Sequence, residues 1–359
     1  MKTIKRKIVI ITVLASAMLL LLYIFSANPD EKLSDKELRE KALSLGLKPI
    51  PTTYKELLEV IDNPQNPLTP TKIALGKKLF FDKNLSYDRD ISCATCHKLK
   101  EGGDDNIPTA IGHDGQKNPS HLNSPTVLNA ALAKAQFWDG RAKDVEEQAG
   151  GPIQASFEMN LTPKEVERRL KNSPTYVKEF KVVFDENITF KNVQKAIGAY
   201  ERTLLTYGKF DDFLNGDDNA IDEKAKRGLN LFINKGCKGC HVGMSVGGQS
   251  IQKFPLRPYK DWFNINFDPN VNIYDQEFPF ENIGGFLGQN NHKRFRVPIL
   301  RNITKTSPYF HNGAIKEIEE AVRIMGKHQI GVDFTKHQID DIVAFFKTLE
   351  GEIVDYGIK

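Results

Sequence analysis

The sequence has few of the residues that define a disulfide-rich or a nucleic-acid-binding protein. Only four of its 359 residues are cysteine, five are methionine and two are tryptophan. The formal net charge is +4, and much of the basic excess lies in the first seven residues. No stripe of basic residues interleaved with aromatic ones follows, so the electrostatic footprint of a nucleic-acid-binding protein is missing.

Alternation of polar and apolar residues, the signature of half-buried strands, is also scarce. The order Thr162, Pro163 and Glu165 predicts a helix start, with threonine as N-cap and proline at the first helical position. Hydrophobic residues make up 40% of the chain, which is enough for ordinary globular cores. A mainly α fold is further indicated by apolar residues at helical spacing in two segments: Val193, Ile197, Tyr200 and Leu204, and Ile339, Ile342, Val343 and Phe346.

The N-terminus has the pattern of an export segment. Four basic residues lie within residues 2–7, and an uncharged apolar run follows over residues 8–25. About 18 apolar residues are just enough to span a bilayer, and Phe25 stands where a cleavage site needs a small residue. For residues 1–27 we therefore favour an uncleaved anchor over a cleaved signal peptide. Both interpretations place the rest of the chain outside the cytoplasm.

An internal repeat organises the remaining chain. Residues 76–80 precede one Cys-x-x-Cys-His motif, and the similar residues 228–232 precede another. Residues 199–204 resemble residues 344–349, and the two segments follow their motifs at nearly the same distance. The repeat predicts that one unit was duplicated. We expect a polar tether with a lead-in helix at 28–50, an N-terminal domain at 51–208 and a C-terminal domain at 209–359.

The two motifs are typical of covalent haem attachment. Two thiols three residues apart can add to the two vinyl groups of one haem, and the next histidine can then ligate its iron. A thioredoxin-like dithiol needs a βαβ pattern, a four-cysteine zinc site leaves the histidines unexplained, and a disulfide within each pair would be strained. The predicted haem sites are Cys93, Cys96 and His97, and Cys237, Cys240 and His241.

The sixth iron ligands are less evident in the sequence. Met1 and Met18 lie in the export segment, and Met244 follows His241 too closely to reach the opposite haem face. Met325 is the remaining candidate for the second haem. For the first haem the candidates are Met159 and His113, with His121 as a nearby competitor of His113; the loop around His113 contains Gly102, Gly103, Gly112 and Gly115, which leave its backbone free to move.

Over roughly residues 50–350 the chain resembles the bacterial di-haem cytochrome c peroxidase family. The residues between positions 248 and 296 do not align confidently. They can form a docking surface for an electron donor or a surface loop. The segments that carry the resemblance are 75–82, 92–97, 123–126, 137–141, 308–313 and 340–345.

The resemblance implies a role for particular residues. The first haem, on His97, would be peroxidatic, with His113 as its removable sixth ligand. The second haem would receive electrons on His241 and Met325. Trp138 matches an aromatic residue between the haems, and Glu158 and Gln148 match polar residues near the peroxide. The resemblance also implies one calcium ion between the domains, at Asn123, Thr306 and Pro308, through oxygen ligands that suit calcium.

The expected activity is reduction of hydrogen peroxide to water with electrons from a small cytochrome c or a cupredoxin. A homodimer is an open alternative to a monomer. Two other functions compete with the peroxidase: a di-haem electron carrier, and a related di-haem oxidase that acts on a partner protein. The related oxidases carry tyrosine where the peroxidases carry methionine on the second haem, so Met325 favours the peroxidase.

Overall fold

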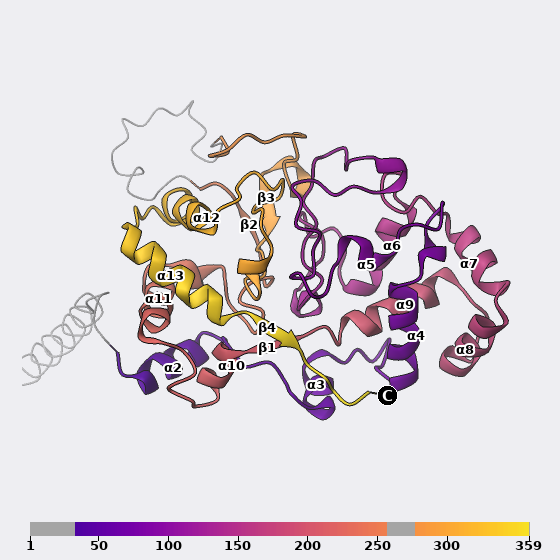
Figure 1. The fold of residues 1–359 in the computed structure, drawn as a ribbon, viewed down its shortest axis with the longest axis horizontal. Coiled ribbons are helices and arrows are strands. Elements are labelled where there is room, and N and C mark those ends of the chain that lie inside the picture. The colour runs from indigo at the N-terminus through magenta and orange to yellow at the C-terminus, as the bar shows by residue number, and fades with distance from the viewer. Residues whose placement is uncertain (1–32, 257–276, 359) are drawn as a thin grey trace, which may run out of the picture.

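The computed structural model describes residues 33–256 and 277–358, and these residues are mainly helical (Figure 1). The expected mainly α fold is therefore confirmed. Short 3₁₀ or π turns lie at 83–85, 113–115, 130–132, 237–239, 289–291, 303–305 and 326–330. The α-helices are α2 (Asp35–Ser44), α3 (Tyr54–Ile61), α4 (Pro70–Phe80), α5 (Cys93–Cys96), α6 (Val145–Gln154), α7 (Pro163–Lys171), α8 (Pro174–Phe184), α9 (Phe190–Glu201), α10 (Lys209–Leu214), α11 (Glu223–Asn234), α12 (Ile318–Met325) and α13 (Lys336–Thr348).

Side-chain caps define several helix starts. Thr162 accepts a hydrogen bond from the backbone N–H of Glu165, and Pro163 is the first residue of α7, as the sequence predicts. α3 begins with a capping box between Thr53 and Glu56. Such caps satisfy backbone donors that the first helical turn leaves unpaired.

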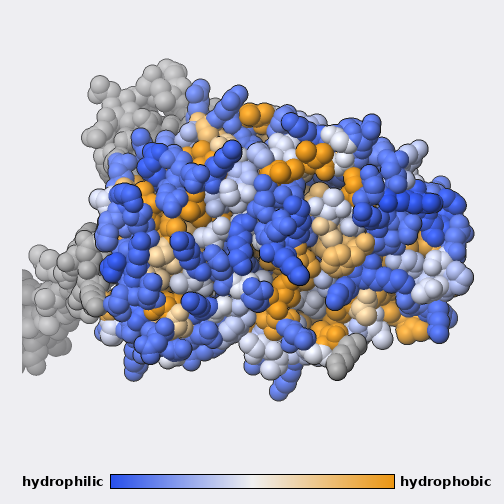
Figure 2. Space-filling view, in the orientation of Figure 1, coloured by the Kyte–Doolittle hydropathy of each residue, from blue (hydrophilic) through white to orange (hydrophobic). Residues whose placement is uncertain are grey.

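Two large hydrophobic clusters form the interior. The first gathers residues from α3, α4, α6, α7, α8 and α9, and the second gathers residues from α2, α10, α11, α12 and α13. Apart from Tyr356, the buried residues of the first cluster precede residue 208, and apart from Leu38, Ala42 and Leu47 those of the second follow it. The division at 208/209 stays a prediction. Figure 2 shows that hydrophilic residues cover most of the face seen in Figure 1.

A close helix crossing occurs once in each cluster. In the first, Gly76 on α4 lies so near the carbonyl oxygen of Ala196 on α9 that an added Cβ would stand 1.9 Å from it. In the second, Gly228 on α11 meets the carbonyl oxygen of Asp341 on α13 at the same 1.9 Å. The crossings contain the segments that repeat in the sequence, so the repeat corresponds to a shared helix pair.

Each end of the described chain packs on the cluster formed by the other half of the chain. Leu38, Ala42 and Leu47, in and just after α2, are buried in the second cluster, although they precede the first in sequence. The tail after β4 returns to the first cluster, where the Tyr356 hydroxyl donates to the Pro51 carbonyl at 3.1 Å. Segments from both ends of the chain thus hold the two halves together.

Two short antiparallel ladders complete the fold. β1 (Thr206–Gly208) pairs with β4 (Gly351–Ile353), and β2 (Ile251–Lys253) pairs with β3 (Arg294–Arg296). Within residues 33–256 and 277–358, no helix combines the length and apolar character needed to cross a membrane. The export segment predicted at 1–27 lies outside these residues.

Candidate functional site

The first Cys-x-x-Cys-His motif borders a cavity beside the first cluster. α5 presents Cys93 and Cys96 in a single turn, and their thiols are free. The cavity holds about 1180 Å³ of empty space, part of it open to solvent, and both cysteines and His97 line it. The structure therefore brings together the residues that haem attachment needs.

A backbone carbonyl orients His97. Its Nδ1 lies 3.1 Å from the carbonyl oxygen of Gly103, so an N–H at Nδ1 leaves Nε2 free to bind iron. Burial lowers the pKa of His97 below its usual value, which favours the neutral ring that ligates metal. The residue thus fits a proximal haem ligand.

The predicted polar residues reach the same cavity. Gln148 on α6 and Glu158 both line it, as does Trp138. Burial raises the pKa of Glu158 above its usual value, because a carboxylate is poorly solvated there. A carboxyl group that holds its proton more tightly is suited to moving protons.

The predicted removable ligand is elsewhere. His113 does not line the first cavity; its Nδ1 lies 2.8 Å from Oδ2 of Asp88, and its ring contacts Tyr87 edge-on with centroids 5.3 Å apart. The neighbouring Gly112 does line the cavity. The structure thus shows His113 turned away and held by Asp88.

The other sequence candidates near the first haem differ in position. Met159 lines the first cavity and is buried, so it stays a candidate ligand. His121 lines neither cavity, and nor does Met244. Of the methionines after the export segment, two therefore face a cavity, Met159 and Met325.

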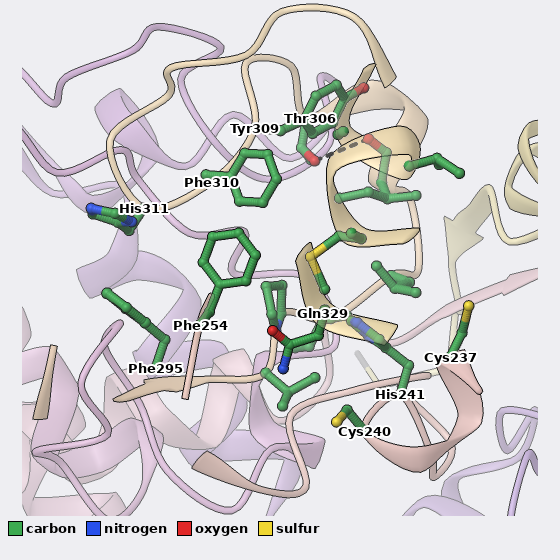
Figure 3. A pocket seen from close by; sticks show the side chains of 18 of the residues that line it. Cys237, Cys240, His241, Phe254, Phe295, Thr306, Tyr309, Phe310, His311 and Gln329 are labelled. Atoms are coloured by element: carbon green, nitrogen blue, oxygen red, sulfur yellow. Dashed lines mark hydrogen bonds between the residues drawn. The ribbon is translucent and has the colours of Figure 1, made fainter. Parts of the chain in front are cut away.

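The second motif borders a larger cavity of about 1560 Å³ (Figure 3). Cys237, Cys240 and His241 line it, together with Met325 at the end of α12. Burial lowers the pKa of His241 to about 4, so the ring is neutral. The predicted ligand pair, His241 and Met325, therefore faces one cavity.

An aromatic wall faces His241 across this cavity in Figure 3. Phe254 stacks on Phe310 with ring centroids 5.3 Å apart, and Phe295 stacks on His311 at 4.8 Å. This apolar wall is better suited to the flat face of a porphyrin than to a polar ligand.

Six residues line both cavities, and we call them the shared wall: Asn123, Ser124, Pro125, Thr126, Trp138 and Arg296. Trp138 is largely buried, and its indole N–H donates to the Asn123 carbonyl at 2.8 Å. This bond fixes the ring between the two cavities, where the resemblance places an aromatic residue.

The predicted calcium residues, Asn123, Thr306 and Pro308, all line the second cavity. Asn123 donates through Nδ2 to the Ile107 carbonyl at 2.8 Å. Among the described residues, no hydrogen bond engages Asn123 Oδ1 or the carbonyl oxygens of Thr306 and Pro308. Unpaired oxygens of this kind fit calcium.

Three charged residues that line the cavities escaped the sequence reasoning: Arg296, Glu201 and Asp104. Arg296 is 4% exposed and lines both cavities, and Glu201 is buried beside the first. Asp104 lines the second cavity, and neither of its carboxylate oxygens has a hydrogen-bond partner among the described residues. Of these three residues, only Arg296 could have been found from the sequence. It lies two residues before Pro298, as Asn123 lies two residues before Pro125, so the two occupy matching positions in the repeat.

Comparisons with known proteins agree with this geometry. A sequence model of the family "Di-haem cytochrome c peroxidase" matches residues 70–219. The cytochrome c551 peroxidase of Pseudomonas aeruginosa is 42% identical over 322 residues, covering 88% of this chain and 87% of that protein. That of Nitrosomonas europaea is 44% identical over 289 residues, covering 79% and 81%. The crystal structure of a MauG-like protein associated with microbial copper homeostasis shares the fold, with TM-score 0.68 and 24% identity over 87% of this chain and 96% of that one.

Proposed function

Because this chain belongs to the di-haem cytochrome c peroxidase family, we propose that it reduces hydrogen peroxide to water, H2O2 + 2 e⁻ + 2 H⁺ → 2 H2O. The observation that carries the proposal is the pair of cavities, each bordered by a Cys-x-x-Cys-His motif, on either side of one shared wall. Relatives that are 42% and 44% identical are named cytochrome c551 peroxidase.

Each cavity holds one covalent haem in this proposal, and the haem irons supply the redox chemistry. Cys93 and Cys96 attach the first haem and Cys237 and Cys240 the second. His97 and His241 are the proximal ligands, and Met325 completes the second site, where a methionine favours electron transfer. Trp138 lines both cavities and would lie between the two haems, on the path of the electrons.

The protein's own residues handle peroxide and its protons at the first haem. Glu158 lines the cavity with a raised pKa and transfers the proton between the two peroxide oxygens. Gln148 orients the bound peroxide from α6. His113 is the removable ligand, and its contact with Asp88 supports a released position outside the cavity.

One calcium ion bound by Asn123, Thr306 and Pro308 completes the proposed cofactors. The division at 208/209, a periplasmic location with an N-terminal anchor, a small cytochrome c or cupredoxin as donor and a homodimer also belong to the proposal. The relatives' names favour the peroxidase over the electron carrier and over the oxidase that acts on a partner protein.

A turnover assay tests the function. The purified two-haem protein, supplied with hydrogen peroxide and a reduced small cytochrome c, should oxidise the donor at two electrons per peroxide. Glu158→Gln should lower the rate by about 100-fold or more, because general acid–base catalysis contributes on that scale. Both haem spectra should stay unchanged.

Glu59→Gln, an exposed residue on α3, is the matched control and should keep the parent rate. A rate for Glu158→Gln equal to the parent's would remove Glu158 from the mechanism. Absence of peroxide turnover by the parent with both a cytochrome and a cupredoxin would favour the electron carrier.

A further inference from the structure

The shared wall contains a pair of matching backbone contacts. The N–H of Asn123 donates to the His311 carbonyl at 2.8 Å, and the N–H of Arg296 donates to the Trp138 carbonyl at 2.8 Å. Asn123 and Arg296 are separated by the same number of residues as Trp138 and His311. The two halves thus meet with Arg296 at the position in the second half that Asn123 occupies in the first.

Backbone contacts fix the Arg296 side chain. It leaves the end of β3, and its Nε donates to the Phe137 carbonyl at 3.2 Å. The residue is 4% exposed, so its guanidinium is anchored inside the molecule and faces both cavities. Such a fixed orientation makes the free end of the guanidinium a preformed donor.

The free end of Arg296 lacks a partner. Its Nη1 is buried without a hydrogen bond, and among the described residues no carboxylate forms an ion pair with it. Burial lowers the pKa of Arg296 to about 10, which still leaves the side chain protonated at neutral pH. A buried cation without an anion is strongly unfavourable, so the site calls for a negatively charged ligand group.

The proposed cofactor carries such groups. A haem has two propionate carboxylates at one edge of the porphyrin, and arginine binds carboxylates with two parallel hydrogen bonds. A chloride ion or a peptide from elsewhere would not explain why the cation faces both cavities. Arg296 lines both cavities, and this position favours a haem carboxylate as its partner.

We propose that Arg296 is a positioning residue that binds a haem carboxylate at the shared wall and keeps a positive charge between the two haems. This inference rests on the proposed function only in assuming that both cavities hold haem. The fixed charge raises the reduction potential of the haem it contacts, because reduction adds negative charge next to a cation in a poorly solvated interior. It also explains why a charged side chain is tolerated in an otherwise apolar wall.

Anaerobic redox titration of the two-haem protein tests the role of Arg296, with each haem followed by its own absorption band. Arg296→Gln should lower the equilibrium constant for reducing at least one haem by about tenfold or more, since a unit charge at close range is lost. Arg296→Lys keeps the positive charge, so its equilibrium constant for haem reduction should stay close to that of the parent. Arg294→Gln removes an exposed arginine from the same strand and should change neither haem.

Unchanged potentials of both haems in Arg296→Gln, with two haems bound, would overturn the inference and leave the peroxidase proposal intact. A parent protein with fewer than two haems would instead overturn the proposed function. If Arg296→Gln fails to fold, Arg296→Lys decides: a shift of the haem propionate vibrations in resonance Raman spectra supports the contact, and identical spectra overturn it.

Discussion

At the scale of single residues, the sequence predicted where the chemistry gathers but not how each side chain is held. Residue types and spacing predicted His97, His241 and Met325, and the family resemblance predicted Glu158; each of these residues lines one of the two cavities. Asp88 and Glu201 were missed because an acid on a loop or a helix has no distinctive local pattern. Their contacts come from segments far apart in the chain, which spacing cannot reveal.

The contact between His113 and Asp88 leads to a first prediction. Asp88→Asn should favour the return of His113 to the first haem, because the released position loses its contact with the Asp88 carboxylate. Contacts of this kind near the surface contribute roughly 0.2–1 kcal/mol, so the ratio of open to closed protein should fall by about 1.4- to fivefold. Electron paramagnetic resonance of the half-reduced protein measures that ratio. Asp90→Asn, an exposed neighbour, should leave it unchanged.

Glu201 gives a second prediction, on pH. Burial and the nearby Glu146 raise the pKa of Glu201 to about 8 from the ordinary 4.5. The folded state therefore holds a proton that the unfolded state releases above about pH 4.5, so this group destabilises the fold increasingly as pH rises towards 8. Glu201→Gln should gain stability over the parent across that window, by up to about 1.4 kcal/mol per pKa unit. Denaturant unfolding at pH 5 and pH 8 measures it, and an equal difference at both pH values would contradict it.

At the scale of elements, the repeat was visible in the sequence because the repeated segments lie in or next to long helices, α4 and α9 in the first half and α11 and α13 in the second. The short ladders were not, since three residues are too few for an alternating pattern. Two asparagines tie the β1–β4 ladder to the loops: Asn129 and Asn302 both donate through Nδ2 to the Thr206 hydroxyl at 2.9 Å. Only the folded chain shows that these asparagines are equivalent.

The close helix crossings support a third prediction. Gly228→Ala on α11 would place a methyl group against the Asp341 carbonyl on α13, so the helices must separate. Overpacking of this kind costs about 1–3 kcal/mol, and a clash with backbone belongs at the upper end. Thermal unfolding should show a lower midpoint. Lys224→Ala, exposed on the same helix, should stay within about 0.5 kcal/mol of the parent.

At the scale of the whole molecule, the proposed calcium residues come from both halves of the chain. Asn123 belongs to the first half, and Thr306 and Pro308 to the second. A bound ion would therefore stabilise the native arrangement of the halves by mass action. Chelation of calcium should lower the unfolding midpoint by about 2 °C or more.

Two variants check this fourth prediction. Asn123→Ala removes the side-chain oxygen and should abolish most of the difference between calcium-loaded and chelated protein. Asn123→Asp keeps an oxygen ligand and should preserve it. An unfolding midpoint of the parent that does not respond to chelation would contradict the calcium site.

The exchanged ends of the chain constrain how either half can be made alone. A fragment cut at the predicted boundary of 208/209 would deprive the first cluster of Tyr356 and the second of Leu38 and Ala42. A version of the second half made alone, as a protein with one haem, would therefore need residues 33–50 joined to it. During biosynthesis, the segment after β4 is translated after the second half, so the first cluster stays incomplete until that segment has been made.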